Sequence, residues 1–329
     1  MAKTLVSDVI VPEIWVPYFR EMSTKLNRLF QSGIIFNDPE VRDEVQGGGS
    51  IINMPFWQAL GGSLQQLSDT GSLTVRKVSG AQDKAIKHLV GDARSWNDLA
   101  KHLSGDDPGE AVAQAWAKWW SERMQEDILI PTLTGVFATA LSSTHVNDIS
   151  SEDYVNNGSA ANLVSSDAII DTIGKLGDHW NKVRALAVHS TVFRQMQKDD
   201  LITFEPISEQ DIEIPRFLGR EVIVDDGLPT EAGSTSGTKY TSYLFGNGAF
   251  GFGEKSLDEN EAFESDRDIL ASDTVLVTRR HFVVHPRGVA FTGSIAGKSP
   301  TVAELKDGSN YTKKYEDKNI LITKLVTNG

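Results

Sequence analysis

The sequence contains no cysteine, and this absence limits the chemistry that the protein can carry out. Thiol catalysis, cysteine–zinc sites and disulfide bonds within the chain all need cysteine and are excluded. An excess of basic residues is also lacking, because 45 acidic residues outnumber 32 basic ones and give a net charge of −13. This balance argues against a general nucleic-acid-binding surface but leaves room for a local basic patch.

Long apolar runs are absent as well, since no stretch approaches the roughly 18 uninterrupted apolar residues that a membrane span needs. The first residues show no apolar core or small-residue cleavage site, and Asp8 and Glu13 interrupt them. We therefore expect no signal peptide and no membrane association, and we expect synthesis in a cytoplasm. With 40% apolar and 23% charged residues among 329, the composition is that of a soluble protein of about two domains.

The N-terminal segment, residues 1–35, is unusually apolar for a chain terminus, and Trp15 is among its large side chains. Pro12 and Pro17 prevent one continuous helix across it, while the spacing from Pro17 to Phe30 fits a short amphipathic helix. The segment is predicted to be an arm that packs either on its own body or on a neighbouring subunit. The residues alone leave both possibilities open.

Residues 45–105 differ from the rest of the chain because glycines interrupt them at short intervals. Strand-like pieces lie between the glycines at 51–54, 73–76 and 85–90, a pattern typical of a long hairpin. No long apolar run is available to make a core in this region. We therefore expect an extended arm that another surface covers, in preference to a floppy surface loop.

A strong helix is predicted to follow. Residues 107–110, Asp-Pro-Gly-Glu, place an N-cap acid, a proline at the first helical position and a glutamate in the first turn. Apolar residues then recur at helical spacing until about Leu129, and Pro131 is expected to end the helix. The helix carries Trp116, Trp119 and Trp120. These tryptophans are interpreted as packing residues rather than as an aromatic binding box.

The second half of the chain reads as a mixture of helices and strands. A loop rich in Ser, Asn and Asp over 140–165 marks a boundary. Ser166 and Ser190 are expected to cap two helices, and Ser299-Pro300 to begin a third. The strands are expected at 185–188, 201–204, 221–225, 240–245, 274–284, 289–291 and 319–326.

One glycine motif matches a cofactor pattern. Residues 246–251 spell GxGxxG after a predicted strand, but a dinucleotide site also needs a helix to open at the third glycine. The residues that follow, 252–264, are too glycine-rich and acidic for that helix. Glycine at alternate positions fits a bent or crowded strand instead. We favour the strand, and keep a nucleotide-binding enzyme as a remote alternative.

The remaining chemical candidates are weak. His281 and His285 are four residues apart, but on the strand that their neighbours favour they would be about 13 Å apart, too far to share a metal. Residues 233–237 place threonine where a hydrolase elbow needs serine. Asp225-Asp226 is interpreted as a turn after a strand. No catalytic, cofactor-binding or metal-ligating residue is predicted, and the chain is expected not to be an enzyme.

The order of these features resembles the major capsid proteins of tailed double-stranded DNA bacteriophages, which have the Hong Kong 97-type fold. The likeness extends from about residue 10 to the end of the chain, with residues 96–99 and 104–108 leading into the tryptophan helix as that family's extended loop leads into its spine helix. The other matching segments are 133–137, 188–190, 201–202, 219–226, 243–249, 264–268, 279–280, 285–288 and 299–329.

This resemblance implies an α+β fold with an N-terminal arm, an extended β-hairpin loop, a peripheral domain built on the spine helix and an axial domain. The implied arm is 1–35 and the loop with its connections is 36–105. The implied peripheral domain combines 106–150 with 270–329, and the implied axial domain is 151–269.

The resemblance further implies a shell protein that assembles into pentamers and hexamers and encloses double-stranded DNA without sequence-specific binding. Contacts between subunits are expected at Trp15 and at four basic residues of the hairpin, Arg76, Lys77, Lys84 and Lys87. No cofactor is expected. A separate scaffolding protein, a portal and decoration proteins are possible partners, and the virion capsid is the expected location. A shell protein of a cellular encapsulin-type nanocompartment is the alternative.

Overall fold

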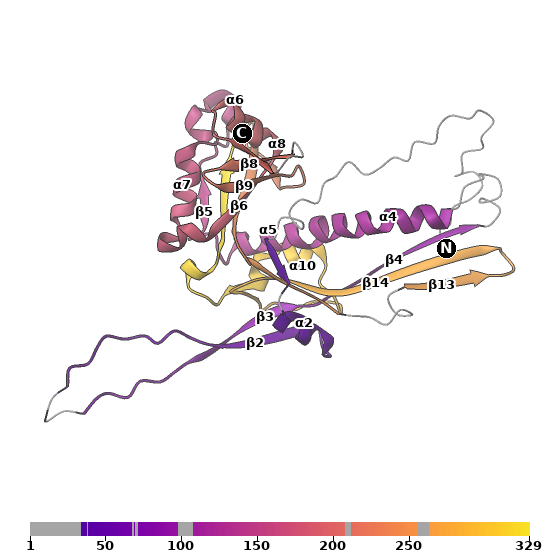
Figure 1. Ribbon diagram of the computed structural model, residues 1–329, viewed down its shortest axis with the longest axis horizontal. Helices are drawn as coiled ribbons and strands as arrows, with labels where there is room; N and C mark the ends of the chain where they lie inside the picture. The colour runs from indigo at the N-terminus through magenta and orange to yellow at the C-terminus, as the bar shows by residue number, and fades with distance from the viewer. Residues whose placement is uncertain are drawn as a thin grey trace.

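The computed structural model describes residues 34–37, 39–67, 69, 72–97, 108–207, 212–255 and 263–329. The predicted N-terminal arm, with Trp15, lies almost wholly outside this part of the chain. Figure 1 shows three parts: a lobe of helices around a sheet, a long helix lying along a ribbon of strands, and a hairpin that projects away from both.

An eight-stranded sheet forms the centre of the lobe. Its strand order is β5-β17-β11-β6-β9-β8-β7, with β10 paired to β11. The strands are β5 (Val146–Asp148), β6 (Val183–Val188), β7 (Thr203–Ile207), β8 (Ile212–Phe217), β9 (Arg220–Val224), β10 (Thr230–Ala232), β11 (Thr238–Gly246) and β17 (Ile322–Thr327). Pairs β6–β9 and β17–β5 are parallel, and the other pairs are antiparallel.

The central strand β11 is buried on both faces, and its successive side chains point into opposite cores. Leu244 of β11 packs into one core cluster with the helices α7 (Ser166–Gly174) and α8 (Ser190–Lys198). Its neighbours Tyr243 and Phe245 pack into a second cluster with the end of the long helix. The lobe therefore has a core on each side of one sheet.

The ribbon is a five-stranded sheet built around β14 (Asp273–Pro286). On one edge β14 pairs with β4 (His88–Asn97). On the other edge it pairs first with β13 (Phe263–Asp268) and then with β12 (Phe250–Glu254). The short strand β1 (Ile35–Asn37) adds in parallel to β12. Strand β14 therefore pairs with every other strand of the ribbon except β1.

The long helix continues beyond its predicted end. Helix α4 (Pro108–Arg123) passes into a π-helical turn (Met124–Leu129) and then into α5 (Ile130–Ala138). The prediction that Pro131 ends the helix is wrong. A proline lacks an N–H and its ring crowds the preceding turn, and the wider π-helical turn before it, with Pro131 in the first turn of α5, accommodates both defects.

The tryptophans of α4 pack on the ribbon, which confirms the packing interpretation. Trp116 and Trp120 form a buried cluster with Trp96 of β4 and Leu276 of β14. The indole Nε1 of Trp116 also donates a hydrogen bond to Asp92 of β4, at 2.8 Å. The helix is therefore attached along the length of the ribbon.

The projecting hairpin begins after α2 (Pro39–Gln46) and consists of β2 (Ile51–Trp57) and β3 (Gly80–Ile86). The predicted strand at 73–76 is wrong, since residues 72–79 form no strand. The predicted strand at 85–90 is divided at Lys87, between β3 and β4. Between Trp57 and Gly80 the described residues form no further strand or helix that could cover the pair. An isolated two-stranded ribbon is marginal in water.

The remaining predictions need small corrections. Ser165 caps α7 in place of Ser166, and His189 caps α8 in place of Ser190. The last helix, α10 (Val302–Lys306), is capped by Thr301. The short strands β15 (Val289–Phe291) and β16 (Tyr311–Lys313) pair with each other near it. The first two predicted N-caps are one residue late and the third is two residues early, because the backbone angles decide which hydroxyl or ring nitrogen meets the free N–H groups.

The predicted domain boundaries do not follow the sheets. Strand β17, from the predicted peripheral segment, lies in the eight-stranded sheet beside β11. Strands β12 and β13, from the predicted axial segment, lie in the ribbon beside β14. Strand pairing between distant segments places them, and no local pattern in the sequence carries that information.

Candidate functional site

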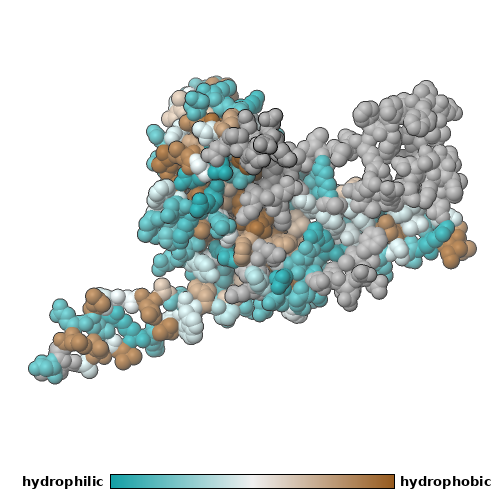
Figure 2. Space-filling view, viewed as in Figure 1, coloured by the Kyte–Doolittle hydropathy of each residue, from teal (hydrophilic) through white to brown (hydrophobic). Residues whose placement is uncertain are grey.

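The loop between β2 and β3 exposes an unusual number of apolar side chains. Leu64 is 100% exposed and Val75 is 94% exposed. The other exposed apolar residues of this segment are Trp57, Leu60, Leu67, Leu73 and Val78. Figure 2 shows the resulting brown patches along the projecting segment. Apolar side chains gathered on a segment that buries none of them mark an interaction surface.

The two legs of this loop hold each other through polar contacts. The side chain of Gln65 donates to the carbonyl of Thr74 and accepts from its N–H, at 3.0 and 2.7 Å. Arg76 lies so close over Gly62 that a Cβ there would overlap its guanidinium, and Gly62 has φ +107°. The loop is therefore a defined two-legged arm, with its apolar side chains directed outward.

The base of the hairpin is anchored by a buried carboxylate. Asp83 of β3 accepts hydrogen bonds from the ring of His285 on β14 and from the N–H of Gly288, both at 2.9 Å. Burial raises the pKa of Asp83, but the hydrogen bond and charge of His285 and the two backbone N–H donors outweigh it and lower the pKa overall. A charged Asp83 thus fastens the hairpin to the ribbon.

The four basic residues predicted as subunit contacts fall into two groups. Arg76 and Lys77 are exposed on the loop, and Lys84 is half-buried on β3. Lys87 is only 4% exposed, and its ammonium donates to the carbonyls of Val45 and Gly47 at 3.1 and 2.6 Å. Burial, followed by the charge of Lys255, lowers the pKa of Lys87. Its interaction therefore lies within the protomer, where it joins the hairpin to α2.

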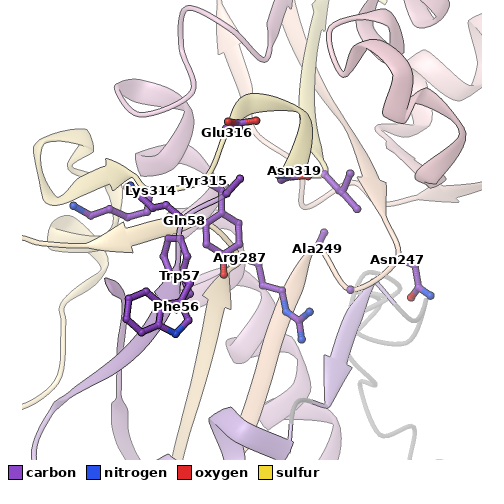
Figure 3. A pocket seen from close by; sticks show the side chains of 13 residues that line it. Phe56, Trp57, Gln58, Asn247, Ala249, Arg287, Lys314, Tyr315, Glu316 and Asn319 are labelled. Carbon is purple, nitrogen blue, oxygen red and sulfur yellow. The ribbon is translucent and has the colours of Figure 1, made fainter. Parts of the chain in front are cut away.

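A groove of about 670 Å³ lies beside the hairpin base. Figure 3 shows Phe56 and Trp57 of the hairpin close to Tyr315 of the C-terminal segment, with Arg287 beside Tyr315. Phe56 and Tyr315 meet edge to face at 4.8 Å. A second groove of about 730 Å³, lined in part by Lys84, lies against the same strands. A groove lined by both aromatic and charged side chains is better suited to binding a polypeptide segment than to catalysing a reaction.

The glycine motif forms a strand–turn–strand junction. Strand β11 ends at Gly246 and β12 begins at Phe250, so no helix follows the motif and the nucleotide-binding alternative is wrong for these residues. A Cβ at Gly246 would lie 2.6 Å from Cβ of Leu321. One at Gly253 would lie 2.8 Å from the backbone of Arg42. The crowded-strand interpretation is confirmed.

The other chemical candidates have structural partners. His285 is bound to Asp83, and Asp225 accepts from Gln125 and from the N–H of Gly227 in the turn after β9. Within the described ranges, no three His, Asp or Glu side chains gather as a metal ion would require. None of the described helices has the length and apolar character needed to cross a membrane.

The sequence reasoning missed Asp83. The available signal was its place between Ala81 and Ala85, which share its face of the strand, so that a carboxylate stands where an inward-facing apolar residue is usual. Only the pairing of β3 against the turn after β14 could show that His285 and Gly288 are its partners.

Comparisons with known proteins agree with this architecture. The chain is 41% identical over 326 residues to the major capsid protein of Bacillus phage SPP1, covering 98% of this chain and 97% of that one. Its fold is similar to the capsid of Ralstonia phage GP4, with TM-score 0.63, 8% identity and coverage of 97% and 96%. It is also similar to the capsid of cyanophage Pam1, with TM-score 0.56, 10% identity and coverage of 96% of both chains.

These similarities confirm the expected α+β capsid fold. A model of the major capsid protein 13-like family matches residues 41–320, which include the hairpin, the long helix, the ribbon and most of the lobe. The chain therefore belongs to the major capsid protein 13-like family.

Proposed function

We propose that this capsid protein assembles, through its projecting hairpin, into the pentamers and hexamers of an icosahedral shell that encloses double-stranded DNA. The observation that carries this proposal is the loop between β2 and β3, whose described apolar side chains are exposed and are covered by no other described residue of the protomer. Membership of a major capsid protein family supports it. The relatives named above are phage capsid proteins, which does not favour a cellular nanocompartment.

The mechanism is geometric. The hairpin is held at its base by Asp83 and Lys87, and the described residues of its loop are exposed, so it can lie over a neighbouring copy without distorting its own protomer. Each copy both offers a hairpin and receives one, and a closed arrangement of many such contacts is stable even where each is weak.

Among the predicted contact residues, Arg76, Lys77 and Lys84 remain our proposed partners for acidic surfaces of a neighbour. Their side chains are exposed or half-buried on the part of the hairpin that projects. Trp15 is proposed as a contact of the N-terminal segment. Lys87 is left out because its ammonium already binds two carbonyls of its own chain.

The finer roles follow from the charge and the architecture. A chain with net charge −13 suits a container that confines DNA without gripping it. We assign the peripheral role to the long helix with its ribbon, the axial role to the lobe, and no enzymatic activity to either. Host cytoplasm is the proposed site of synthesis, and scaffolding, portal and decoration proteins are the proposed partners.

Electron microscopy of the purified, full-length chain tests the shell. Regular closed particles or five- and six-fold rings are expected. Chains that stay monomeric at every concentration and salt condition would contradict the proposal. Mass spectrometry of particles purified from infected cells tests for the proposed partner proteins.

The hairpin residues are tested by reversing charge. Arg76→Glu together with Lys77→Glu is expected to raise the concentration needed for assembly by roughly tenfold, because like charges then face the acidic neighbour. Lys298→Glu, an equivalent change at an exposed lysine outside the hairpin, is the control. If both variants assemble like the parent chain, the hairpin charges have no role.

A further inference from the structure

The turn between β8 and β9 has an unusual conformation. Its two residues, Leu218 and Gly219, have φ of +46° and +75°. Glycine, asparagine or aspartate normally occupies both positions of such a turn, because a bulky side chain is strained at positive φ. Leu218 is nevertheless 62% exposed and packs in no core. A strained and exposed leucine at a turn tip indicates a function for the side chain outside the protomer.

A buried arginine lies directly behind this turn. Arg220 is only 8% exposed, and its guanidinium contacts the carbonyls of Leu218 and Trp180 at the long distances of 3.4 and 3.5 Å. Its Nε is buried with no hydrogen-bond partner. Among the described residues no carboxylate lies within ion-pair distance of it. Burial of a guanidinium without an anion costs free energy, and Arg220 lacks the anionic partner that would offset this cost.

A second arginine adds to this charge. Strands β6 and β9 are parallel with Ala185 opposite Glu221, which places Arg184 beside Arg220. Arg184 is exposed. Burial, followed by the charge of Arg184, lowers the pKa of Arg220. Trp180, whose ring lies under the Arg220 guanidinium at 5.9 Å, is 55% exposed. We call these four residues, Trp180, Arg184, Leu218 and Arg220, the Arg220 patch.

Among the described residues, no carboxylate of the same protomer forms an ion pair with Arg184 or Arg220. Asp178, on the same 3₁₀ segment as Trp180, is paired with Lys318 at 2.7 Å. Glu221 follows Arg220 on β9, so its side chain points to the opposite face of the sheet. The patch therefore combines two basic and two apolar side chains, which are complementary to a partner surface that is both acidic and apolar.

A complementary surface lies on helix α7. Asp167 and Asp171 are one turn apart on its exposed face, with Ile170 between them. Within the described part of the chain neither carboxylate has an ion-pair partner. Helix α7 packs over β17 and β5, at the end of the strand order away from β8 and β9. The two surfaces are thus distinct regions of one lobe.

We propose that the Arg220 patch binds the Asp167–Asp171 face of α7 on a second copy of this chain. The proposal rests on the proposed shell function and names one contact within it. Carboxylates of the neighbour pair with Arg184 and reach Arg220, while Ile170 packs on Leu218 and Trp180. Because the two surfaces differ, the contact is head-to-tail, and its repetition closes a ring of lobes.

A substitution in the turn distinguishes a role of Leu218 in an interface from a role in folding. Leu218→Asn places a residue that tolerates positive φ at the strained position, so the protomer is expected to unfold at an equal or higher temperature. Assembly is expected to weaken at the same time, with the concentration for ring or shell formation raised roughly fivefold to tenfold. A purely structural leucine would give the opposite pair of results or no change.

A charge swap tests the partner. Arg184→Asp and Asp171→Arg are each expected to reduce assembly about tenfold or more, and the double variant is expected to recover most of it. Lys198→Asp, a similar reversal at an exposed site on α8 of the same lobe, is the control and is expected to assemble like the parent chain. Sedimentation and electron microscopy of the full-length chain give the readout.

The outcomes distinguish this contact from the shell itself. If the parent chain forms shells but both single variants assemble equally well, the contact is wrong and the shell function stands. Failure of the double variant to recover assembly also overturns the pairing. Binding of a double-stranded oligonucleotide that Arg184→Asp abolishes, with assembly unchanged, would assign the patch to nucleic acid and overturn the proposal. If the parent chain never assembles, the shell function itself fails.

Discussion

The lobe and the hairpin use the same kinds of apolar residue in opposite ways. In the lobe, Leu244 is completely buried between a strand and two helices. In the hairpin, Leu64 is completely exposed. The lobe has enough layers to cover both faces of its sheet, whereas the hairpin loop has only its own two legs. Under the proposed assembly, folding of the protomer and association between protomers are supported by different regions of one chain.

The hairpin differs from an unstructured loop in how its base is held. Asp83 and Lys87 are buried charged groups whose partners belong to the ribbon and to α2. Such contacts set the direction in which the hairpin leaves the body without supplying an apolar core. The result is a stiff attachment beneath a surface that needs a partner.

The largest expected effect is a loss of stability caused by a substitution in the lobe. Phe245→Ala removes a fully buried ring between β11 and the long helix and is expected to lower the free energy of unfolding by about 3–5 kcal/mol. Phe204→Ala, at a half-exposed ring of the same lobe, should change it by only about 0.5 kcal/mol. Denaturant unfolding of the protomer measures both. Equal effects would mean that the lobe core does not govern stability.

A smaller effect is expected at the hairpin base. Asp83→Asn removes the charge that binds His285 and Gly288 and is expected to cost about 1–3 kcal/mol at neutral pH. Since folding lowers the pKa of Asp83 below its ordinary 3.8, its contribution is complete above that value and disappears as pH falls through the folded-state pKa. The difference between parent and variant should therefore shrink below about pH 4.

Acid unfolding curves and amide exchange of β3 measure this contribution. Asp43→Asn, the same change at an exposed carboxylate of α2, provides the control and should leave β3 protection unchanged. A parent–variant difference that stays constant down to pH 2 would contradict a charged Asp83 in the folded state.

The smallest effect on the protomer is expected in the loop. Leu64→Ser with Val75→Ser should change the free energy of unfolding by only about 0.5 kcal/mol, because both side chains are already in water. Assembly should nevertheless fail or require far more protein, since the neighbour loses its apolar contact. Val155→Ser, at another exposed site, should leave both properties unchanged. If the loop variant assembles normally, the exposed apolar side chains of the loop do not support association, and the proposed difference between hairpin and lobe is wrong.

Much of the fold was predictable from local patterns. The strand 289–291 has the bounds that its residues indicated, and 221–225 is shifted by one residue, because apolar β-branched residues between turns define a buried strand. The glycine motif was recognisable as a strand junction because the residues after it cannot form a helix. By contrast, residues 73–76 look like a strand but form none, since strand formation depends on a partner and not on composition alone.

The candidate site was predictable only in part. The order of glycines marked the hairpin, but Lys87 was expected to face a neighbour and instead binds carbonyls of its own chain. Neither Asp83 nor Arg220 was predicted as a site residue, because a lone charged residue in a strand has the same appearance in the sequence whether it faces water or the core. Their partners are 202 and 40 residues away along the chain.

The sequence by itself determined the helices and many of the strands, the absence of thiol chemistry, and the presence of a segment without its own core. These properties depend on interactions between neighbouring residues, which the sequence order specifies directly. The tertiary structure alone decided that β17 joins the lobe, that β12 and β13 join the ribbon, and which charged groups are buried. Such pairings depend on contacts between distant residues, and many different pairings are compatible with the same local pattern.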